Sequence, residues 1–420
     1  MLVEFSVANF RSIKDKQTLS LMAGPIVSKE EKVDENNVME TPAGIRLLKS
    51  IAIYGANASG KSNLVKAMLR MLNFVDKSFQ DEDNIHGFEA FALDEEYERE
   101  PLFFELVFLV KGMMYRYGFE ITGHKVTAEW LFGPAKKNEV AYFTRTGNTI
   151  DVNKTSFREG ADLTENKTRD TTLFLNVVHA FNGPIAKEIK DFLRFSIVIT
   201  TGLNDAVIRN HTLQLLQEEQ MKRQILKLMK SADFGLEEIN HVDVNEVKFP
   251  DNPPPVSGDR KDSEKQDFVL LSLRKIKNAD EGGLPLAFMF DQFESEGTKR
   301  FLTYAGPIIE RLQSGGVLVI DEFDARLHPT LTRRIVELFN SKEHNPKNAQ
   351  LIFVTHDINL LDSSLLRRDQ IYFAEKNSAG ETSLYSLINV GGVRNDASYE
   401  KDYMKGKYGA LPYLRNFNIQ

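Results

Sequence analysis

The sequence predicts an α/β fold that carries an antiparallel β subdomain and a small inserted helical lobe. The first observation is a nearly continuous apolar run, residues 47–54, which ends at Gly55 and precedes an amphipathic helix. Such runs are typical of strands that are covered on both faces in a parallel sheet. The second is the alternation of strand and helix patterns after residue 266. The third is the hairpin pattern of residues 102–150, which is typical of antiparallel strands.

The N-terminal half begins with an expected strand, because Val3, Phe5 and Val7 alternate with polar neighbours. Residues 102–121 predict two strands joined around Lys111 and Gly112, and residues 140–150 predict a second hairpin that turns at Gly147. Helices are expected over residues 185–235, most clearly over 213–230. The polar, proline-rich residues 250–267 predict an exposed connection.

The C-terminal part alternates between the two types of element. Strands are expected at residues 268–276, 316–322 and 349–357, and helices from about residue 298 and over residues 331–340. We therefore expect three regions. They are residues 1–180 with the β subdomain, 181–265 with the helical lobe and an exposed linker, and 266–420 with the remainder of the α/β fold.

The composition fits a folded globular protein, excludes several kinds of site and indicates a cellular location. Of the 420 residues, 42% are hydrophobic and 27% are charged, and the net charge of −7 argues against indiscriminate coating of nucleic acid. Cysteine is absent, which excludes disulfides, zinc fingers and a cysteine nucleophile. Because no apolar run approaches membrane-spanning length, we expect a soluble protein with a cytoplasmic location.

The motif "GANASGKS", residues 55–62, matches the pattern of a phosphate-binding loop and stands between a buried strand and a helix. Its glycines let backbone N–H groups curl around phosphates, while Lys61 reaches the β and γ phosphates and the Ser62 hydroxyl is placed for Mg²⁺. The sequence thus predicts a nucleotide site that binds ATP and Mg²⁺. Its expected binding residues are Gly55, Asn57, Ala58, Ser59, Gly60, Lys61, Ser62 and Asn63.

An acidic pair follows the apolar run at residues 317–320. Asp321 and Glu322 stand at the carboxyl end of the expected strand, the edge of an α/β sheet where ligands bind. We expect Asp321 to hold Mg²⁺ through water and Glu322 to orient or deprotonate the attacking water. Without the phosphate-binding loop, the same pair would serve equally well as an acidic helix cap.

The run "LIFVTHD" repeats this geometry and ends at His356. A histidine at the carboxyl end of a strand can donate a hydrogen bond to the γ-phosphate. A single histidine is more often a structural residue, so its predicted catalytic role depends on the order of phosphate loop, acidic pair and histidine.

In that order, "GANASGKS", "SEGT", "LVIDEFD" and "VTHD" resemble the motifs of ABC-type ATPases. Together with "NFRSIKD", "SEGTKRFL", "VLVIDEFDARLHP", "LRRDQIYFAEKN" and "YMKGKYGALP", they are similar to prokaryotic ABC-like ATPases of the RloA and abortive-infection type. The resemblance implies an ABC-type P-loop ATPase head, the nucleotide-binding domain of such proteins. It spans nearly the whole chain and is weakest over residues 151–265.

The resemblance also implies that the chain assembles with itself. In ABC-type heads the signature segment, here "SEGT", caps the γ-phosphate that a second subunit holds, which makes a homodimer or larger homo-oligomer the expected active form. Ser295 and Gly297 would lie at the start of a helix, where free N–H groups and the helix dipole attract an anion. An ordinary N-cap by Ser295 is the alternative.

Several residues depart from the family pattern or stay ambiguous. Ala58 replaces a frequent glycine, and His328 with Pro329 stands where transporters usually carry an aspartate. No glutamine can be assigned as a magnesium sensor. Arg11 stands at a position that approaches the nucleotide in similar ATPases, although a solvated surface arginine is equally plausible. The spacing in residues 166–170 does not match a guanine-binding motif, which favours ATP.

Three functions remain open at this point. The first is an ATP-driven switch that gates a separately encoded effector, a nuclease or toxin, in bacterial defence against phage, as the resemblance implies. The second is a DNA-repair ATPase resembling RecF, for which direct DNA contact would come from Lys222, Arg223, Lys227 and Lys230 of the helical lobe. The lysines and tyrosines of residues 401–415 suit nucleic acid or a protein interface, and a solvated charged face is the alternative for both regions. The third is a scaffold that holds ATP without turning it over. No membrane partner is expected.

Overall fold

The computed structural model describes residues 1–135, 138–164, 167–202, 205–243, 268–275 and 285–412. The chain divides into two compact units. The first unit comprises Met1–Leu203, Arg311–Asp324 and Thr332–Gln420, and the second comprises Asn204–Glu310 and Ala325–Leu331. The sequence-based boundary at residue 180 stays a prediction, and the one at residue 265 lies outside the described residues.

A six-stranded sheet forms the centre of the nucleotide-binding fold in the first unit. Five of its strands run parallel, and the sixth closes an antiparallel hairpin at one edge. The order across the sheet is β11 (Ile197–Thr200), β15 (Val317–Ile320), β16 (Gln350–Val354), β5 (Ser50–Tyr54), β17 (Ile371–Lys376) and β18 (Thr382–Ser386). The parallel strands are buried on both faces, as their apolar sequences predict.

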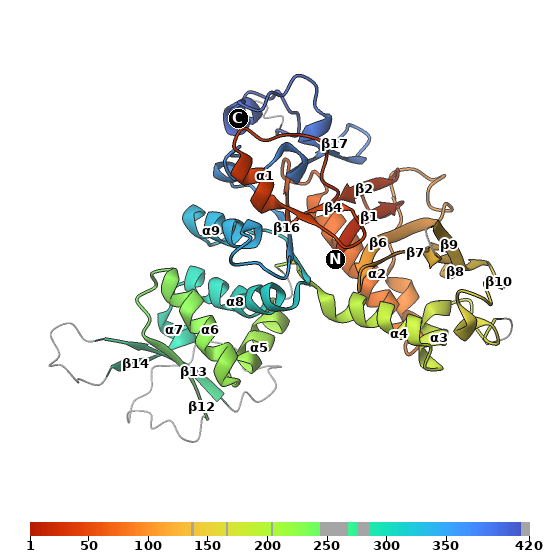
Figure 1. The fold of residues 1–420 in the computed structure, drawn as a ribbon, viewed down its shortest axis with the longest axis horizontal. Helices are drawn as coiled ribbons and strands as arrows, with labels where there is room; N and C mark the ends of the chain where they lie inside the picture. The colour runs from red at the N-terminus through yellow and green to blue at the C-terminus, as the bar shows by residue number, and fades with distance from the viewer. Residues whose placement is uncertain (136–137, 165–166, 203–204, 244–267, 276–284, 413–420) are drawn as a thin grey trace, which may run out of the picture. The chain divides into compact units, whose positions relative to one another are not determined.

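A seven-stranded antiparallel sheet forms the β subdomain of the same unit, and its hairpins turn where the sequence predicts. The order is β10 (Thr149–Val152), β9 (Asn138–Thr146), β8 (Lys125–Ala135), β7 (Met113–Thr122), β6 (Leu102–Val110), β1 (Leu2–Ala8) and β2 (Gln17–Ser20). A separate two-stranded hairpin joins β3 (Val38–Glu40) to β4 (Arg46–Leu48). Figure 1 shows that the red N-terminal and blue C-terminal segments both belong to this unit.

The two large sheets share one hydrophobic core, to which α2 (Lys61–Lys77) contributes a buried stripe. Met68, Met71 and Val75 lie on that stripe at the spacing of one helical face. The buried Gln350 amide joins the sheets, because its Oε1 accepts from the Leu2 N–H at 2.7 Å and its Nε2 donates to the Leu2 carbonyl at 2.9 Å. The β subdomain therefore supports the sheet that carries the phosphate loop.

The remaining helices of the first unit are shorter. They are α1 (Glu31–Asn37), α3 (Phe174–Ala180), α4 (Pro184–Asp191), α10 (Tyr399–Met404) and most of α9 (Pro329–Asn340). None of the helices among the described residues is both long and apolar enough to cross a membrane.

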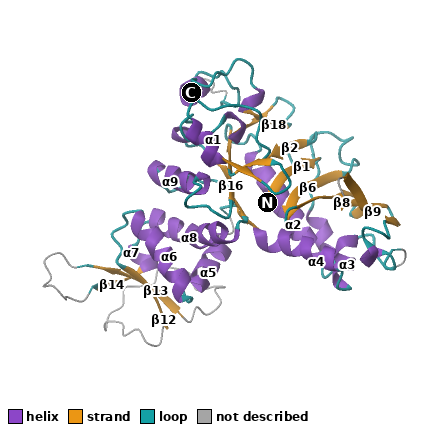
Figure 2. Cartoon of the chain, in the orientation of Figure 1, coloured by secondary structure: helices purple, strands orange, loops and turns teal. Residues whose placement is uncertain are grey.

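The second unit combines helices with a small antiparallel sheet, as Figure 2 shows. Its elements are α5 (Asp205–Leu215), α6 (Glu219–Ser231), β12 (Glu238–Asp243), β13 (Phe268–Arg274), β14 (Leu286–Met289), α7 (Phe290–Phe293) and most of α8 (Glu296–Ser314). The α/β class with an antiparallel subdomain and a helical lobe is thus confirmed, with a small sheet added to the lobe.

Two local predictions were wrong. The run at residues 47–54 is not one strand, since it breaks at Lys49: β4 pairs with β3, whereas β5 enters the parallel sheet. Within the expected helices of residues 185–235, residues 197–200 form β11, because Ile197 and Ile199 are buried beside β15. A four-residue strand is too short to show a period against helical surroundings.

Candidate functional site

The phosphate loop follows β5 at its carboxyl end and leads into α2. Gly55 has φ +153° and Gly60 has φ +101°. A Cβ atom at Gly55 would lie 2.2 Å from the Ala374 carbonyl oxygen, and one at Gly60 would lie 2.1 Å from Thr382 Oγ1. Both positions therefore require glycine for conformation and for space. Ala58 adopts φ +63°, a left-handed conformation that the glycine of related loops takes without strain.

The Lys61 side chain is enclosed by the phosphate loop. Its Nζ donates to the carbonyls of Gly55 and Ala56, both at 2.8 Å, and the residue is only 6% exposed. Burial lowers the pKa of Lys61 to about 8, against the opposing charges of Asp321 and Asp324. In the first turn of α2 the Asn63 N–H donates to the Gly60 carbonyl at 2.9 Å, whereas the N–H groups of Lys61 and Ser62 precede the first intrahelical hydrogen bond. The ammonium and these N–H groups together make a cradle for an anion.

Ser62 and Asp321 meet across the sheet edge. The Asp321 carboxylate accepts a hydrogen bond from the Ser62 side chain and another from the Glu322 N–H at 3.1 Å. The backbone of Asp321 is fixed at the end of β15, because its N–H donates to Thr200 at the end of β11. Burial raises the pKa of Asp321, and these hydrogen bonds act against that rise. A hydroxyl beside a carboxylate is an oxygen pair of the kind that Mg²⁺ prefers.

Glu322 follows with φ +53° and an exposed side chain. A left-handed conformation is uncommon for glutamate, and such strain persists where the surrounding structure enforces it. The next residue is anchored, since the Phe323 N–H donates to the Val354 carbonyl at 2.9 Å. The turn therefore sends Glu322 outward while its neighbours stay buried.

His356 follows β16 and belongs to the same cluster of charges. Burial by the surrounding protein lowers its pKa, and Lys61 acts in the same direction, while Asp324, Glu322 and Asp321 act in the opposite one. Asp324 holds the segment in place, because its Oδ1 accepts from the Thr355 hydroxyl at 2.6 Å and from the His356 N–H at 3.0 Å. Sequence reasoning quoted Asp324 within its motif but gave it no role.

Three side chains, linked by hydrogen bonds, connect the start of α2 to the backbone of the phosphate loop. The Asn63 amide donates to Ser12 Oγ at 2.7 Å, Ser12 Oγ lies 2.8 Å from Thr382 Oγ1, and the Thr382 hydroxyl donates to the Ser59 carbonyl at 2.9 Å. The pairing of Thr382 with Ser59 leaves the Ser12 hydroxyl as the donor to Thr382. Ser12 and Thr382 were missed by sequence reasoning, and with 370 positions between them no local pattern joins them.

Arg11 is next to Ser12 in the chain, but its side chain contacts Glu89. Its guanidinium donates to Glu89 Oε1 at 3.0 Å, and its backbone N–H donates to the Glu89 carbonyl at 2.9 Å. Its Nε has no hydrogen-bond partner among the described residues. The expected contact of Arg11 with a nucleotide stays a prediction.

The signature segment belongs to the second unit and begins α8. Ser295 Oγ accepts from the Thr298 N–H at 3.1 Å and lies 2.9 Å from Thr298 Oγ1, so Ser295 is the N-cap of this helix. Glu294 is held by Ser272 and Arg274 of β13, both at 2.7 Å. Ser295 and Gly297 thus stand at a helix N-terminus, as the sequence predicts, and their role toward a second subunit stays a prediction.

His328 has a structural task of its own. Its Nδ1 accepts from the Thr330 N–H at 3.2 Å and lies 2.8 Å from Thr330 Oγ1, which caps the first turn of α9. This use explains why a histidine can stand before Pro329, at the start of a helix.

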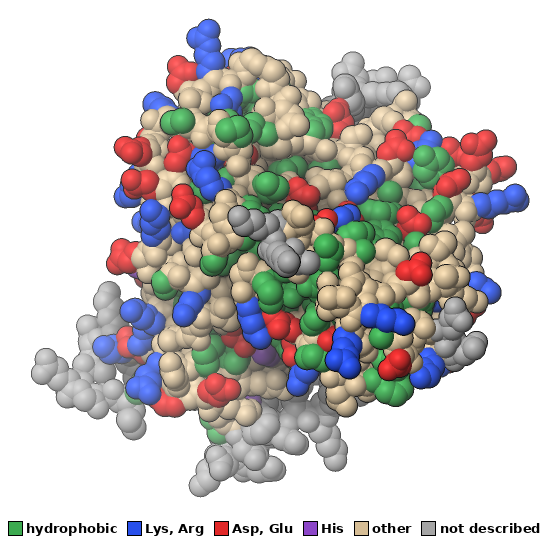
Figure 3. Space-filling model, turned by 45° about the vertical axis from the view of Figure 1, so that its right-hand side comes forward, with side chains coloured by type: hydrophobic (Ala, Val, Ile, Leu, Met, Phe, Trp, Pro, Cys, Tyr) green, Lys and Arg blue, Asp and Glu red, His purple; other side chains and the backbone are tan. Residues whose placement is uncertain are grey.

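The basic residues considered for DNA contact are largely engaged with acidic neighbours. On α6, Lys222 pairs with Glu238 at 3.1 Å, Arg223 with Glu219 at 3.5 Å and Lys230 with Glu237 at 3.9 Å. On the face drawn in Figure 3, blue basic and red acidic side chains are interspersed.

The C-terminal tyrosines are mostly structural. Tyr403 and Tyr408 are buried against Phe373, with ring centroids at 5.3 and 5.9 Å, and the Tyr403 ring lies 6.1 Å from that of Tyr54. Residues 413–415 of the same segment lie outside the described residues. The described tyrosines therefore support the strand that leads into the phosphate loop.

The residues present fit a nucleoside triphosphate with Mg²⁺. The loop offers a glycine-lined cradle, Lys61 and the first turn of α2 offer positive charge, and Ser62 with Asp321 offers oxygen ligands. In addition, Ser59 Oγ is buried without a hydrogen-bond partner among the described residues. A buried polar atom of this kind fits a site completed by a ligand or water.

A family model described as "AAA domain, putative AbiEii toxin, Type IV TA system" matches residues 50–362, more than half of the chain. Among solved structures, the SMC head domain from Thermotoga maritima is similar, with 14% identity, a TM-score of 0.41 and coverage of 92% of this chain and 98% of that one. No curated protein matches the sequence. The family match confirms the expected resemblance to AAA ATPases of the abortive-infection type. The chain belongs to this family of AAA domains.

Proposed function

We propose that the chain binds ATP with Mg²⁺, hydrolyses it and acts as a molecular switch. The observation that carries the proposal is the meeting of Lys61, the Ser62–Asp321 pair and His356 at the carboxyl edge of one parallel sheet. Ligands bind at this edge in open α/β sheets.

Each residue has a separate task in this proposal. When bound, Mg²⁺ neutralises phosphate charge and aligns the phosphates for in-line attack. Ser62 and Asp321 hold the metal ion, and the Lys61 ammonium neutralises the β and γ oxygens. Phosphate charge would favour the ammonium form of Lys61, whose pKa burial lowers. Glu322 orients or deprotonates the attacking water, and His356 donates a hydrogen bond to the γ-phosphate.

Self-assembly is the second part of the proposal. The capped N-terminus of α8 at Ser295 supports it, because such a terminus can bind the γ-phosphate held by another copy of the chain. ATP would close a homodimer or a larger homo-oligomer, and hydrolysis would open it. The toxin–antitoxin wording of the family description supports the further proposal that the switch gates a separately encoded nuclease or toxin in bacterial defence against phage. The cytoplasmic location expected from the sequence stays a prediction.

The RecF-like alternative has less support. Three of the four basic residues on α6 that were candidates for DNA contact form ion pairs with carboxylates, which offsets their attraction for phosphates. Salt-dependent DNA binding by the isolated protein would favour this alternative over the proposal.

The test compares Glu322→Gln with Lys61→Ala. Glu322→Gln should bind ATP, hydrolyse it at least about a hundredfold more slowly and accumulate as the closed assembly in size-exclusion chromatography. Lys61→Ala should lose tight ATP binding and stay open, whereas Lys77→Ala, at the exposed end of the same helix, should behave as the wild type. Wild-type hydrolysis by Glu322→Gln would overturn the catalytic assignment. A Glu322→Gln protein that binds ATP but never assembles would overturn the switch.

A further inference from the structure

A cavity lies in the first unit, at the opposite edge of the parallel sheet from the phosphate loop. Its volume is about 820 Å³, and its walls come from α1, the β3–β4 hairpin and the segment after α9. Lys49, which lines it, directly precedes β5, whereas the phosphate loop follows β5. Five residues of strand, roughly 17 Å, separate the two places. The cavity is therefore distinct from the ATP site.

The most unusual residue of this cavity is Lys49. It is only 1% exposed, and no carboxylate of the described residues forms an ion pair with it. Its ammonium donates only to the carbonyls of Asn340 and Ser341, at 3.4 and 3.5 Å. These bonds are longer than the usual 2.9 Å or so. Burial of an ammonium group with such weak compensation lowers stability.

A purely structural role for Lys49 is the competing explanation. Asn340 ends α9, and a lysine can cap the carbonyls at the C-terminus of a helix. That role does not account for Lys342, which also lines the cavity and is close enough to lower the pKa of Lys49 together with burial. Four cations line the cavity, namely Lys29, Arg46, Lys49 and Lys342, beside four carboxylates, namely Glu31, Asp34, Glu35 and Glu40. None of the four cations forms an ion pair with a carboxylate of the described residues, so they offer a place for an anion.

The other walls supply different chemistry. Glu31 and Glu35 are four residues apart on α1 and line the cavity, and neither forms an ion pair with a described residue. Val27, whose side chain is 69% exposed, and the buried Val38 and Met39 add an apolar surface. The cavity thus offers cations for an anion, carboxylates for hydroxyl or amino groups, and an apolar contact for a planar ring.

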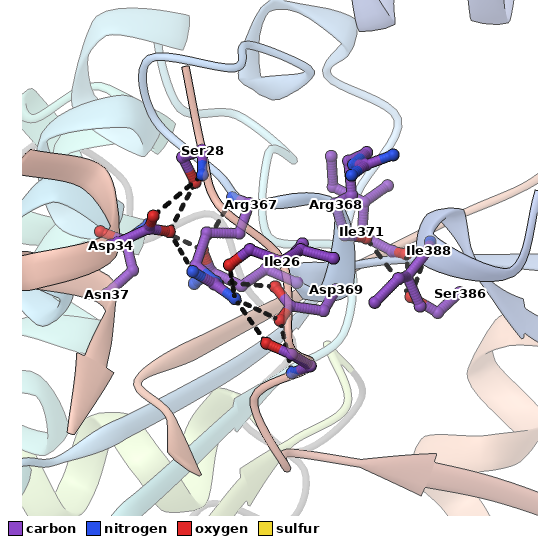
Figure 4. A network of polar contacts seen from close by, with 12 residues as sticks. Ile26, Ser28, Asp34, Asn37, Arg367, Arg368, Asp369, Ile371, Ser386 and Ile388 are labelled. Carbon is purple, nitrogen blue, oxygen red and sulfur yellow. Dashed lines mark hydrogen bonds and ion pairs between the residues drawn. The ribbon is translucent and has the colours of Figure 1, made fainter. Parts of the chain in front are cut away.

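One wall is fixed by a buried network. Asp34 accepts from the Ser28 hydroxyl at 2.7 Å and from the Ser28 N–H at 2.9 Å, and it is paired with Arg367. Arg367 is also bound by Asp369 at 2.8 Å, as Figure 4 shows. Asp34 is held by Ser28 and Arg367 and forms no ion pair with Lys49. The wall is preformed, as ligand sites usually are.

We propose that this cavity is a second ligand site that takes a small phosphorylated molecule of nucleotide size. The phosphate binds the exposed Lys342, with the charge of the buried Lys49 behind it, the hydroxyl or amino groups face Glu31 and Glu35, and the ring covers Val27. A phosphate matches two ammonium groups better than a carboxylate does, since it carries up to two negative charges. The volume lies within the range of roughly 300–1,000 Å³ for ligand sites. The site is independent of the ATP proposal.

The test uses Lys61→Ala protein, in which the phosphate loop is disabled, and the four ribonucleoside monophosphates as probes in isothermal titration calorimetry. At least one probe should bind with a stoichiometry near one per chain. Adding Lys342→Glu should weaken this binding roughly tenfold or more, and Lys49→Met should weaken it similarly. Adding Lys347→Gln, which removes a nearby exposed charge outside the cavity, should change it less than about twofold.

Three outcomes would overturn the proposal. The first is that none of the four probes binds the Lys61→Ala protein. The second is that Lys342→Glu binds the probes as well as Lys347→Gln does, a comparison that holds even if Lys49→Met fails to fold. The third is that inorganic phosphate binds as tightly as the best nucleotide, which would leave the acidic and apolar walls without a role.

Discussion

The Asp324 carboxylate accepts a hydrogen bond from the backbone N–H of His356, with 3.0 Å between Oδ1 and N. The same oxygen accepts from the Thr355 hydroxyl at 2.6 Å. Asp324 thus fixes the segment that carries His356 without touching the reacting groups, and it connects the loops that follow β15 and β16. It acts as a positioning residue in the proposed mechanism.

Asp324→Ala should lower ATP hydrolysis roughly tenfold and leave ATP binding nearly unchanged, because it removes the acceptor that holds the His356 backbone. Asp324→Asn keeps an acceptor oxygen and should retain most of the activity. In both variants the pKa of His356 should fall further, since the Asp324 charge favours the protonated ring. Steady-state kinetics and histidine NMR measure the two effects. Equal activities of the two variants would exclude the positioning role.

Thr382→Val should weaken ATP binding by roughly two- to tenfold, because the Ser59 carbonyl loses its donor and the loop loses its outer support. Thr382→Ser keeps the hydroxyl and should restore affinity close to that of the wild type. The turnover number should change less than the affinity does in either variant. Titration with a fluorescent ATP analogue, alongside kinetics, measures both quantities. If valine and serine behave alike, the hydroxyl chain does not support the loop.

Ser295→Asp separates the two roles of the signature residue. Aspartate caps a helix as well as serine does, so the melting temperature should stay within a few degrees of the wild type. Its negative charge would repel a neighbouring copy's γ-phosphate, so hydrolysis should nevertheless fall strongly. Mixing Ser295→Asp with Lys61→Ala protein should recover part of the activity, because one composite site per mixed pair remains intact. Absence of recovery at every mixing ratio would argue against sites shared between copies.

Lys49→Met should raise the free energy of unfolding at pH 7 by about 2 kcal/mol. Burial lowers the pKa of Lys49 from 10.5 to about 8, so below pH 8 the folded state carries a poorly compensated buried charge. The unfolded state binds more protons between these values, so wild-type stability rises from about pH 8 to 10.5 and the advantage of the variant shrinks. Urea unfolding at pH 7 and pH 10 measures this, with Lys347→Met as the exposed control. A less stable variant at pH 7 would mean that helix capping outweighs desolvation.

Much of the nucleotide-binding fold could be predicted from the sequence because its signals are local. The phosphate loop combines a buried strand, a fixed spacing of glycines and lysine, and a helix, all within about thirty residues. Asp321, Glu322 and His356 follow from the ends of apolar runs, since parallel strands bring their carboxyl ends to one edge. The hairpins of the β subdomain were predicted for the same reason, because their turns lie between the strands that they join.

The remainder depends on contacts between distant segments. Thr382 reaches Ser59 only after β17 and β18 have folded beside β5, and nothing near either residue marks that contact. Tyr403 and Tyr408, which look like part of an interface in the sequence, are buried and pack against Phe373. In the sequence Lys49 looks like part of one apolar run. It lies between β4 and β5, which belong to different sheets, and the run therefore breaks there.

The place of β5 between β16 and β17 has a consequence for biosynthesis. The hairpins from β6 to β10 join neighbouring segments and can form while the nascent chain is still emerging from the ribosome. The strand that carries the phosphate loop pairs on both sides with segments made some 300 residues later. The ribosome must therefore synthesise β17 before β5 can pair with both of its neighbouring strands and hold the phosphate loop in its native position. Prematurely terminated products would lack this frame, so we expect that an incomplete copy could not start the proposed ATP cycle.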